Sequence, residues 1–228
     1  MKRSIKLLTI VTMVAICASA NAEEVSQKVL QHAQTFTNQM TQLRDENLSF
    51  AEKLEKVTAV FKSNFALPTM SKLILGDEIW SNSSTEAKIN YLKTYNKYIA
   101  GFFMSSLSQA DNMNFAESVD SKDESYFISN GKVLAGGTET AVSLHYSAAK
   151  SLMIWDVKTG GHSYIIGDHS DNFKSHLQAF SCNISDKKQS ADAKLNFVAK
   201  YMDCMLAAEF KNKTAKQCSE QVKAGFSC

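Results

Sequence analysis

The chain has 228 residues, of which 44% are hydrophobic and 21% charged, and its formal net charge at pH 7 is +2. A chain of this length can bury one sizeable core, or form one domain with an appendage. The small net charge and the lack of lysine clusters interleaved with aromatic residues exclude a typical nucleic-acid-binding surface.

Residues 1–22 have the pattern of a secretory signal peptide. Three basic residues precede an almost wholly apolar stretch over 7–18, and Ala20 and Ala22 are the small residues that a signal peptidase requires. The apolar stretch is shorter than the roughly 20 residues that span a bilayer, so we expect cleavage and export rather than membrane anchoring. Cleavage removes three of the 25 basic residues and none of the 23 acidic ones, which leaves a net charge of 22 − 23 = −1.

The mature sequence begins with helical periodicity. Apolar residues recur every three or four positions over 24–43 and again over 50–61, which predicts two amphipathic helices. Pro68, the only proline, suits a first helical turn, and Gly76 suits the position just past a helix end. We therefore expect a short apolar helix between these two residues.

A long helix is predicted over about 84–108. Ser83 and Glu86 have the spacing of a capping box, which marks a helix start. The apolar residues of this helix form a broad face that suits core packing or the lining of a cavity. This face consists of Ile89, Leu92, Tyr95, Tyr98, Ile99, Phe102 and Phe103.

After Asp111 the apolar periodicity changes to two, which is typical of strands. Short β-like segments occur at about 113–119, 125–129 and 132–135, and Asn130-Gly131 is a hairpin signal. This part of the sequence therefore predicts antiparallel strands joined by tight turns.

Two longer strands follow. Residues 139–146 alternate apolar and polar side chains, and 151–157 return as the next strand. Gly160-Gly161 is expected to form the turn into another strand over 163–166, after which Asp168 or Ser170 caps a helix. Helices followed by a meander of strands predict an α+β fold, with the N-terminal helices packed on one side of a curved antiparallel sheet.

The C-terminal part contains all the cysteines that remain after residue 22, namely Cys182, Cys204, Cys218 and Cys228. An even number of cysteines in an exported protein predicts two disulfides, for which three connectivities exist. Helical patterns over about 190–210 and 215–225 predict a helical hairpin. Cys204 and Cys218 lie on its two helices and are expected to pair, which leaves Cys182 to pair with Cys228.

Candidate catalytic side chains crowd residues 156–176 without forming a known motif. The nucleophile-elbow, zinc-protease, P-loop and dinucleotide-binding motifs are all absent from the sequence. The spacing of seven between successive histidines suits neither a strand nor one helical face as a metal site. We expect no catalysis, metal or cofactor from this cluster, which comprises Asp156, His162, Ser163, Asp168, His169 and His176.

Two stretches together resemble one protein family. FALPTMSKLILGDEIWSNSSTEAKINYLKTYNKYI, starting at Phe65, is similar to a family segment with a short helix ending in Leu-Gly, then Trp, a Ser/Thr loop and a helix with spaced aromatics. IWDVKTGGHSYIIGDHSDNFKSHL, starting at Ile154, resembles a later block with an aromatic-Asp-Val sequence, a Gly-x-Ser turn and a Phe-containing helix. The order and spacing over about residues 24–181 are similar to those of the Mla-type periplasmic phospholipid-binding proteins, the MlaC or toluene-tolerance family.

The resemblance implies a soluble periplasmic carrier that is not an enzyme and needs no cofactor. Such a carrier moves phospholipid between an inner-membrane ABC transporter complex and an outer-membrane lipoprotein complex, and so supports outer-membrane lipid asymmetry. It implies a lipid-binding domain over 23–181, preceded by the signal peptide over 1–22 and followed by a cysteine-containing extension over 182–228. In the family the acyl chains lie in an apolar cleft between helices and sheet, and the headgroup stays near solvent.

The positions that bear this role here are apolar residues of the helix near 70–75, of the long helix and of the 141–157 strands. Methionine and aromatic side chains adapt to irregular apolar shapes, which suits such a lining. The expected lipid-binding residues are Met70, Leu73, Ile74, Trp80, Tyr98, Phe102, Val142, Leu144, Tyr146, Met153 and Trp155.

Two other functions remain open from the residues alone. Curved-sheet domains of this kind also host isomerases, in which Tyr98 and Asp156 would act inside the cavity. The remaining alternative is an exported binding module built around the disulfide-containing tail. A cavity lined without charge favours the carrier, whereas a buried carboxylate within the cavity favours an enzyme.

Overall fold

The structure is a computed structural model that describes residues 5–148, 151–163, 165–178, 185–209 and 215–224. Helices come first and last, and a meander of strands lies between them. The elements in chain order are α1 (Ile5–Asp45), α2 (Phe50–Asn64), α3 (Leu67–Leu75), α4 (Asp77–Asn82), α5 (Thr85–Leu107), β1 (Asn112–Ser121), β2 (Tyr126–Ala135), β3 (Thr138–Ser147), β4 (Met153–Thr159), β5 (His162–Ser163), α6 (Ile166–Gln178), α7 (Lys187–Glu209) and α8 (Ala215–Ala224).

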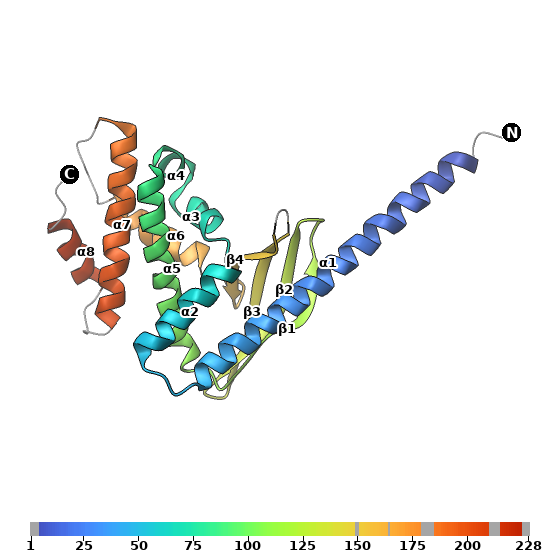
Figure 1. The fold of residues 1–228 in the computed structure, drawn as a ribbon, viewed down its shortest axis with the longest axis horizontal. Coiled ribbons are helices and arrows are strands. Elements are labelled where there is room, and N and C mark those ends of the chain that lie inside the picture. The colour runs from blue at the N-terminus through green and yellow to red at the C-terminus, as the bar shows by residue number, and fades with distance from the viewer. Residues whose placement is uncertain (1–4, 149–150, 164, 179–184, 210–214, 225–228) are drawn as a thin grey trace.

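The five strands form one antiparallel sheet in the order β1-β2-β3-β4-β5. α1 packs along β1, and α5 stands between α2 on one side and α7 on the other (Figure 1). One hydrophobic core runs through both the helices and the sheet. This arrangement confirms the predicted α+β fold with N-terminal helices against a curved antiparallel sheet.

α1 contains the predicted helix over 24–43 and is longer than that prediction. Its buried side chains, among them Val29, Phe36 and Met40, recur at the expected helical spacing and face the sheet side of the core. Residues 5–22 continue the same helix, and their cleavage as a signal peptide stays a prediction. Within the described part of the chain, no helix combines the length and the apolar composition needed to cross a membrane.

The starts of α2 and α5 are set by serine caps. Ser49 and Glu52 form a reciprocal capping box at α2. The cap of α5 is Ser84, whose hydroxyl accepts from the Ala87 amide at 3.1 Å, so the prediction of Ser83 was wrong by one residue. The reason is that the Ser83 hydroxyl donates to the Ile79 carbonyl at 2.7 Å and so completes the end of α4 instead.

The predicted hairpin at Asn130-Gly131 is wrong, because β2 runs unbroken through both residues. The β2–β3 turn lies at Gly136-Gly137, where φ is 55° and 78°. Gly131 is needed for a different reason, since a Cβ there would lie 2.0 Å from the Asn114 carbonyl oxygen. At this point β1 departs from regular register and its backbone approaches β2 closely.

Gly160-Gly161 forms the predicted turn after β4, with φ of 56° and 86°. The strand after it is much shorter than predicted and ends at Ser163, because the chain enters α6 at Ile166. Asp168 and Ser170 therefore lie inside α6 and do not cap it, contrary to the prediction. The cap comes instead from Asp156 and Ser163, which accept from the first amides of α6.

α7 and α8 form the predicted helical hairpin, and a disulfide joins Cys204 to Cys218 with a Cα–Cα distance of 5.6 Å. Cys182 and Cys228 lie outside the described residues, so their pairing stays a prediction. α7 is part of the core, because Phe197 and Met202 are fully buried. The Asp192 carboxylate of α7 also accepts from the Ser84 amide at the start of α5, at 2.7 Å.

Candidate functional site

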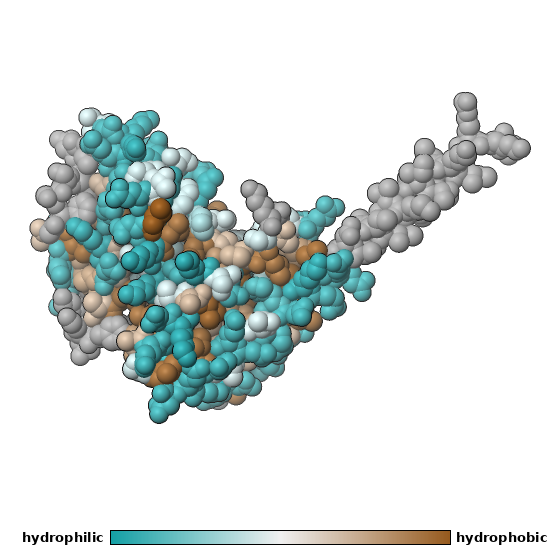
Figure 2. Space-filling view, in the orientation of Figure 1, coloured by the Kyte–Doolittle hydropathy of each residue, from teal (hydrophilic) through white to brown (hydrophobic). Residues whose placement is uncertain are grey.

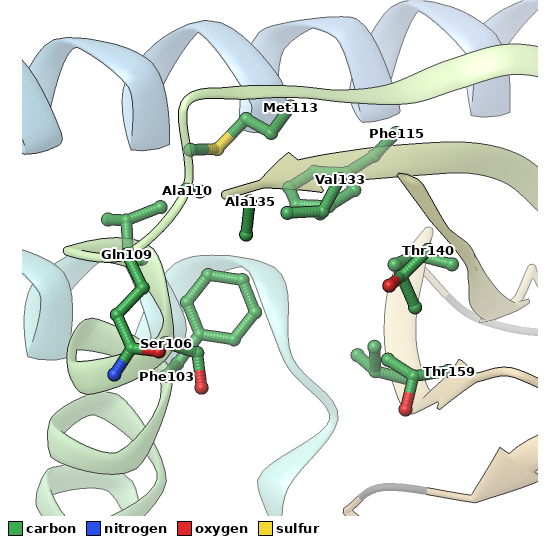
Figure 3. A pocket seen from close by; sticks show the side chains of 13 residues that line it. Phe103, Ser106, Gln109, Ala110, Met113, Phe115, Val133, Ala135, Thr140 and Thr159 are labelled. Atoms are coloured by element: carbon green, nitrogen blue, oxygen red, sulfur yellow. The ribbon is translucent and has the colours of Figure 1, made fainter. Parts of the chain in front are cut away.

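The main cavity lies between the last turns of α5, the start of β1 and one face of the sheet, and its volume is about 300 Å³ (Figure 3). Hydrophobic residues gather where the helices meet the sheet, as Figure 2 shows on one face of the molecule. The cavity is lined by Phe103, Ser106, Leu107, Gln109, Ala110, Met113, Phe115, Val133, Ala135, Thr140, Val142, Val157 and Thr159.

The sheet residues of the lining face the cavity because alternate side chains of a strand lie on the same face of the sheet. Val142 is paired with Thr159 in the β3–β4 ladder, and Thr140 is paired with Val133 in the β2–β3 ladder. Residues two apart on a strand share a face, so Thr140 and Val142 both project toward α5. Figure 3 shows Thr140 and Thr159 on one side of the cavity and Phe103 and Ser106 on the other.

The lining is mostly apolar and carries no ionisable side chain. Nine of its 13 residues are hydrophobic, and the four polar ones are Ser106, Gln109, Thr140 and Thr159. Hydroxyl and amide groups can form hydrogen bonds, but none of them is a general acid or base near neutral pH. The cavity is therefore suited to holding an apolar molecule and lacks the groups for proton transfer.

Phenylalanine rings line the inner wall of the cavity and continue into the core. Phe103 lies 5.2 Å from Phe61 between ring centroids, and Phe115 lies 5.7 Å from Phe36. Phe61 in turn stacks on Phe65 at 4.3 Å. Edge-to-face and stacked contacts of this kind link α1, α2, α5 and β1 into one aromatic cluster behind the cavity.

Of the predicted lipid-binding residues, Val142 lines this cavity. Met70, Ile74, Leu144 and Tyr146 are fully buried in side-chain packing, and Tyr98 is nearly so. Leu73 and Phe102 are instead 49% and 41% exposed. The structure thus distributes the predicted set over the core, the surface and the cavity, and the lipid contacts of its members stay predictions.

The tryptophans and Met153 lie apart from the cavity. Trp80 packs edge-on against Tyr91, and Lys88 Nζ lies 5.5 Å from its ring centroid. Trp155 lies beside Tyr126 and His145 at 5.7 Å from each ring, on the sheet face opposite the cavity. Met153 begins β4 and is half-buried.

Sequence patterns pointed to some of the lining residues that the prediction omitted. Phe103 belongs to the predicted aromatic face of the long helix, and Thr140 precedes Val142 by two positions on one strand. Met113 and Phe115 have the same spacing on β1. No sequence signal marks Gln109 or Ala110, because both follow the end of α5 and face the cavity only through the path of that connection.

The Asp/His/Ser cluster does not assemble into a catalytic triad. Asp156 is 2% exposed, and burial raises the pKa of its carboxyl although Ser163 donates to it at 3.0 Å. His169 is buried against the rings of Tyr98 and Phe173, and burial lowers its pKa to about 4. Neither His169 nitrogen has a hydrogen-bond partner among the described residues, so His169 is not linked to the Ser163–Asp156 pair.

The predicted isomerase pair is also absent from the cavity. Neither Tyr98 nor Asp156 is among the residues that line it. The described residues contain no group of three or more His, Cys, Asp or Glu side chains placed to hold a metal ion.

The sequence model of the family described as "MlaC protein" matches residues 30–182, which is more than half of the chain and includes every residue of the cavity lining. The chain belongs to the MlaC family. This confirms the resemblance found in the sequence, and it leaves α7 and α8 outside the part that the MlaC family model matches.

A solved structure shares the fold of this MlaC family member. It is a phospholipid-binding protein from Ralstonia solanacearum in complex with a phospholipid, with a TM-score of 0.54 and 14% sequence identity. The match covers 83% of this chain and 98% of that chain. A search of curated proteins by sequence found no match.

Proposed function

We propose that the protein is a phospholipid carrier and that the cavity between α5 and the sheet holds the acyl chains. The observation that carries this proposal is the lining, which is mostly apolar and without charge. Membership of the MlaC family and the fold shared with a phospholipid-bound protein support it. The same lining argues against acid–base catalysis in this cavity, because none of its side chains is a general acid or base near neutral pH.

The energetics of lipid transfer explain why an apolar cavity is needed. Each methylene that moves from an apolar environment into water costs about 0.8 kcal/mol, so a two-chain phospholipid leaves a membrane extremely slowly on its own. A carrier replaces the bilayer with apolar side chains during transit. Phe103, Met113 and Val157 provide such surface without presenting a charge to the chains.

The cavity must widen to take a whole phospholipid. Its volume of about 300 Å³ is at the lower end of the usual range for pockets of drug-sized ligands, about 300–1,000 Å³, and a two-chain lipid is larger than such ligands. α5, which forms the helical wall of the cavity, is fixed in position because it packs between α2 and α7. We therefore propose that widening separates the sheet from α5 and leaves the α5–α7 contact intact.

The carrier is proposed to act in the periplasm, after removal of residues 1–22. There it would exchange phospholipid with an inner-membrane ABC transporter complex and an outer-membrane lipoprotein complex. The signal-peptide pattern and the MlaC family membership support this setting.

The test is direct analysis of what the protein carries. The mature protein is exported by a bacterial host, purified without detergent and extracted with organic solvent, and the extract is analysed by mass spectrometry. We expect about one phospholipid per protein. Extracts without phospholipid, both before and after incubation with phospholipid vesicles, would overturn the proposal.

A further inference from the structure

A second cavity, of about 200 Å³, lies next to the first and differs from it in chemistry. Leu107, near the end of α5, lines both cavities. The main cavity has no charged side chain in its lining, whereas the second has two basic ones, Arg44 and Lys53. The remaining lining residues of the second cavity are Leu43, Val57, Met104, Leu107 and Ser108.

Two parts of the chain, the end of α1 and the connection between α5 and β1, hold Arg44 in place at this second cavity. It lies in the last turn of α1, and its Nη1 donates to the carbonyls of Ala110 at 3.2 Å and Asp111 at 2.9 Å. These bonds fix the guanidinium against the connection between α5 and β1. Asp45 accepts from Nε at 2.7 Å and from Nη2 at 3.3 Å.

Lys53 of α2 places a second cation beside Arg44. Its Nζ donates to the Arg44 carbonyl at 2.8 Å, which orders the lysine over the end of α1. An ammonium carries three donors and a guanidinium five. The hydrogen bonds formed with the described residues use one donor of Lys53 and four of Arg44, so two and one remain for a ligand.

Three acidic side chains, Asp45, Glu46 and Asp111, lie near the two cations. Glu46 pairs with Lys56 at 2.6 Å and Asp111 accepts a hydrogen bond from the Gly136 amide at 2.8 Å, whereas Asp45 pairs with Arg44. The Asp45 side chain is 59% exposed, whereas that of Arg44 is 19% exposed. An anion that replaces Asp45 at the guanidinium therefore releases a carboxylate that water already solvates well. Hydrogen bonds between cationic donors and a phosphate are among the stronger ones in proteins.

We propose that this second cavity binds the phosphate of the carried phospholipid, with Arg44 and Lys53 as its ligands. This inference rests on the proposed function. The acyl chains pass Leu107 into the main cavity, and a change in the Leu107 side-chain rotamer joins the two spaces. The pair of cavities then matches an amphiphile, because the cationic one receives the anionic phosphate and the uncharged one receives the chains.

The test compares a phospholipid with diacylglycerol of the same acyl chains, which lacks the phosphate. Binding of phosphatidylglycerol and of diacylglycerol is measured for the wild-type protein and for Lys53→Ala, Lys53→Arg and Lys56→Ala. Lys56 lies one turn further along α2, is exposed, and does not line the cavity, so it controls for the loss of a positive charge.

We expect the wild-type protein to prefer phosphatidylglycerol over diacylglycerol by tenfold or more. Lys53→Ala reduces this preference by about tenfold, as expected for one charge-assisted hydrogen bond. Lys53→Arg and Lys56→Ala retain it. Equal binding of the two lipids by the wild-type protein, or the same preference in Lys53→Ala as in Lys56→Ala, overturns the inference.

Inorganic phosphate provides a separate arm of the experiment. We expect it to bind at least a hundredfold more weakly than phosphatidylglycerol, because it gains nothing from the apolar cavity. If phosphate alone binds as tightly as the lipid, the cavity is a site for free phosphate and the lipid assignment is overturned. If the wild-type protein binds neither lipid, the proposed function itself fails, which is distinct from failure of the phosphate site.

Discussion

Asp156 accepts a hydrogen bond from the Ser163 hydroxyl at 3.0 Å, and the same carboxylate oxygen accepts from the Ile166 amide at 3.3 Å. The Ser163 hydroxyl oxygen in turn accepts from the Gly167 amide at 2.8 Å. The first amides of a helix have no partner within the helix, so these bonds satisfy groups that burial would otherwise leave unpaired. A buried carboxyl therefore has a structural role here, at the start of α6.

Substitution of Asp156 separates this structural role from its charge. Asp156→Ala leaves the partly buried Ser163 hydroxyl and Ile166 amide without their acceptor and should lower the free energy of unfolding by about 2–3 kcal/mol. Asp156→Asn keeps an acceptor oxygen and has no charge to desolvate, so its cost should be below about 1 kcal/mol. Urea unfolding at pH 7 measures both variants. A loss for Asp156→Asn as large as that for Asp156→Ala would show that the charge itself is required.

His169 should make the protein less stable in mild acid. Burial lowers its pKa to about 4, below the value of 6.5 that applies to an unfolded chain. Between pH 4 and 6.5 the unfolded state binds more protons than the folded state. The contribution of neutral His169 to the free energy of unfolding is therefore fully present above about pH 6.5 and is lost as the pH falls toward 4. The loss at pH 5 from this residue is about 2 kcal/mol.

Replacement of His169 by phenylalanine tests the assignment. His169→Phe should make the unfolding free energy depend less on pH between 5 and 7, because phenylalanine does not titrate. The rings of Tyr95, Tyr98, Phe102 and Phe173 around this position can accept another aromatic ring. His162→Phe, at an exposed position near the β4–β5 turn, is the control and should retain the wild-type dependence. Equal pH dependence of His169→Phe and the wild-type protein would show that His169 is not the source of the loss of stability in acid.

Gly131 should tolerate no side chain. Gly131→Ala places a Cβ 2.0 Å from the Asn114 oxygen and 2.6 Å from the Phe115 Cα, and both are backbone atoms that cannot move alone. We expect a loss of about 3 kcal/mol or more in unfolding free energy. Gly137→Ala has open space and suffers only from its positive φ, at about 1 kcal/mol. Thermal and urea unfolding of both variants should rank them in this order.

We expect the Cys204–Cys218 disulfide to contribute to the free energy of unfolding and not to the amount of bound phospholipid. A closed loop of this length contributes about 3 kcal/mol by restricting the unfolded chain. Replacing both cysteines by serine should lower unfolding free energy by that amount. Lipid content below the unfolding temperature should stay at the wild-type level, because neither cysteine lines a described cavity. Loss of lipid from a folded double variant would assign the tail a direct part in binding.

Local patterns predicted the elements well where each residue's role depends on its near neighbours. The helices over 24–43 and 50–61, the turn at Gly160-Gly161 and the Cys204–Cys218 pair all follow from spacing within a short segment. The hairpin prediction at Asn130-Gly131 is wrong because the role of this glycine depends on a residue distant in the sequence. Gly131 is required by the close approach of the β1 backbone at Asn114, and the sequence pattern of β2 alone does not show this contact.

The cavity was less predictable than the fold, because its hydrophobic lining residues are of the same types as the residues of the core. Leu144 and Val142 are two residues apart on one face of β3, yet Leu144 is fully buried and Val142 borders the cavity. The difference depends on where α5 ends relative to the sheet, which is a tertiary property. Thr140 and Thr159 were overlooked because polar residues near strand ends resemble ordinary solvent-facing positions.

Filling the cavity with a larger side chain tests whether it holds the acyl chains. Val142→Trp projects a large ring into the cavity, whereas Ala141→Trp places the same ring on the opposite, exposed face of β3. Both variants are purified from an exporting host, checked for folding by circular dichroism, and extracted for phospholipid by mass spectrometry. If the cavity holds the acyl chains, we expect about one phospholipid per protein for Ala141→Trp and less than a tenth of that for a folded Val142→Trp. Equal phospholipid in the two folded variants would contradict it.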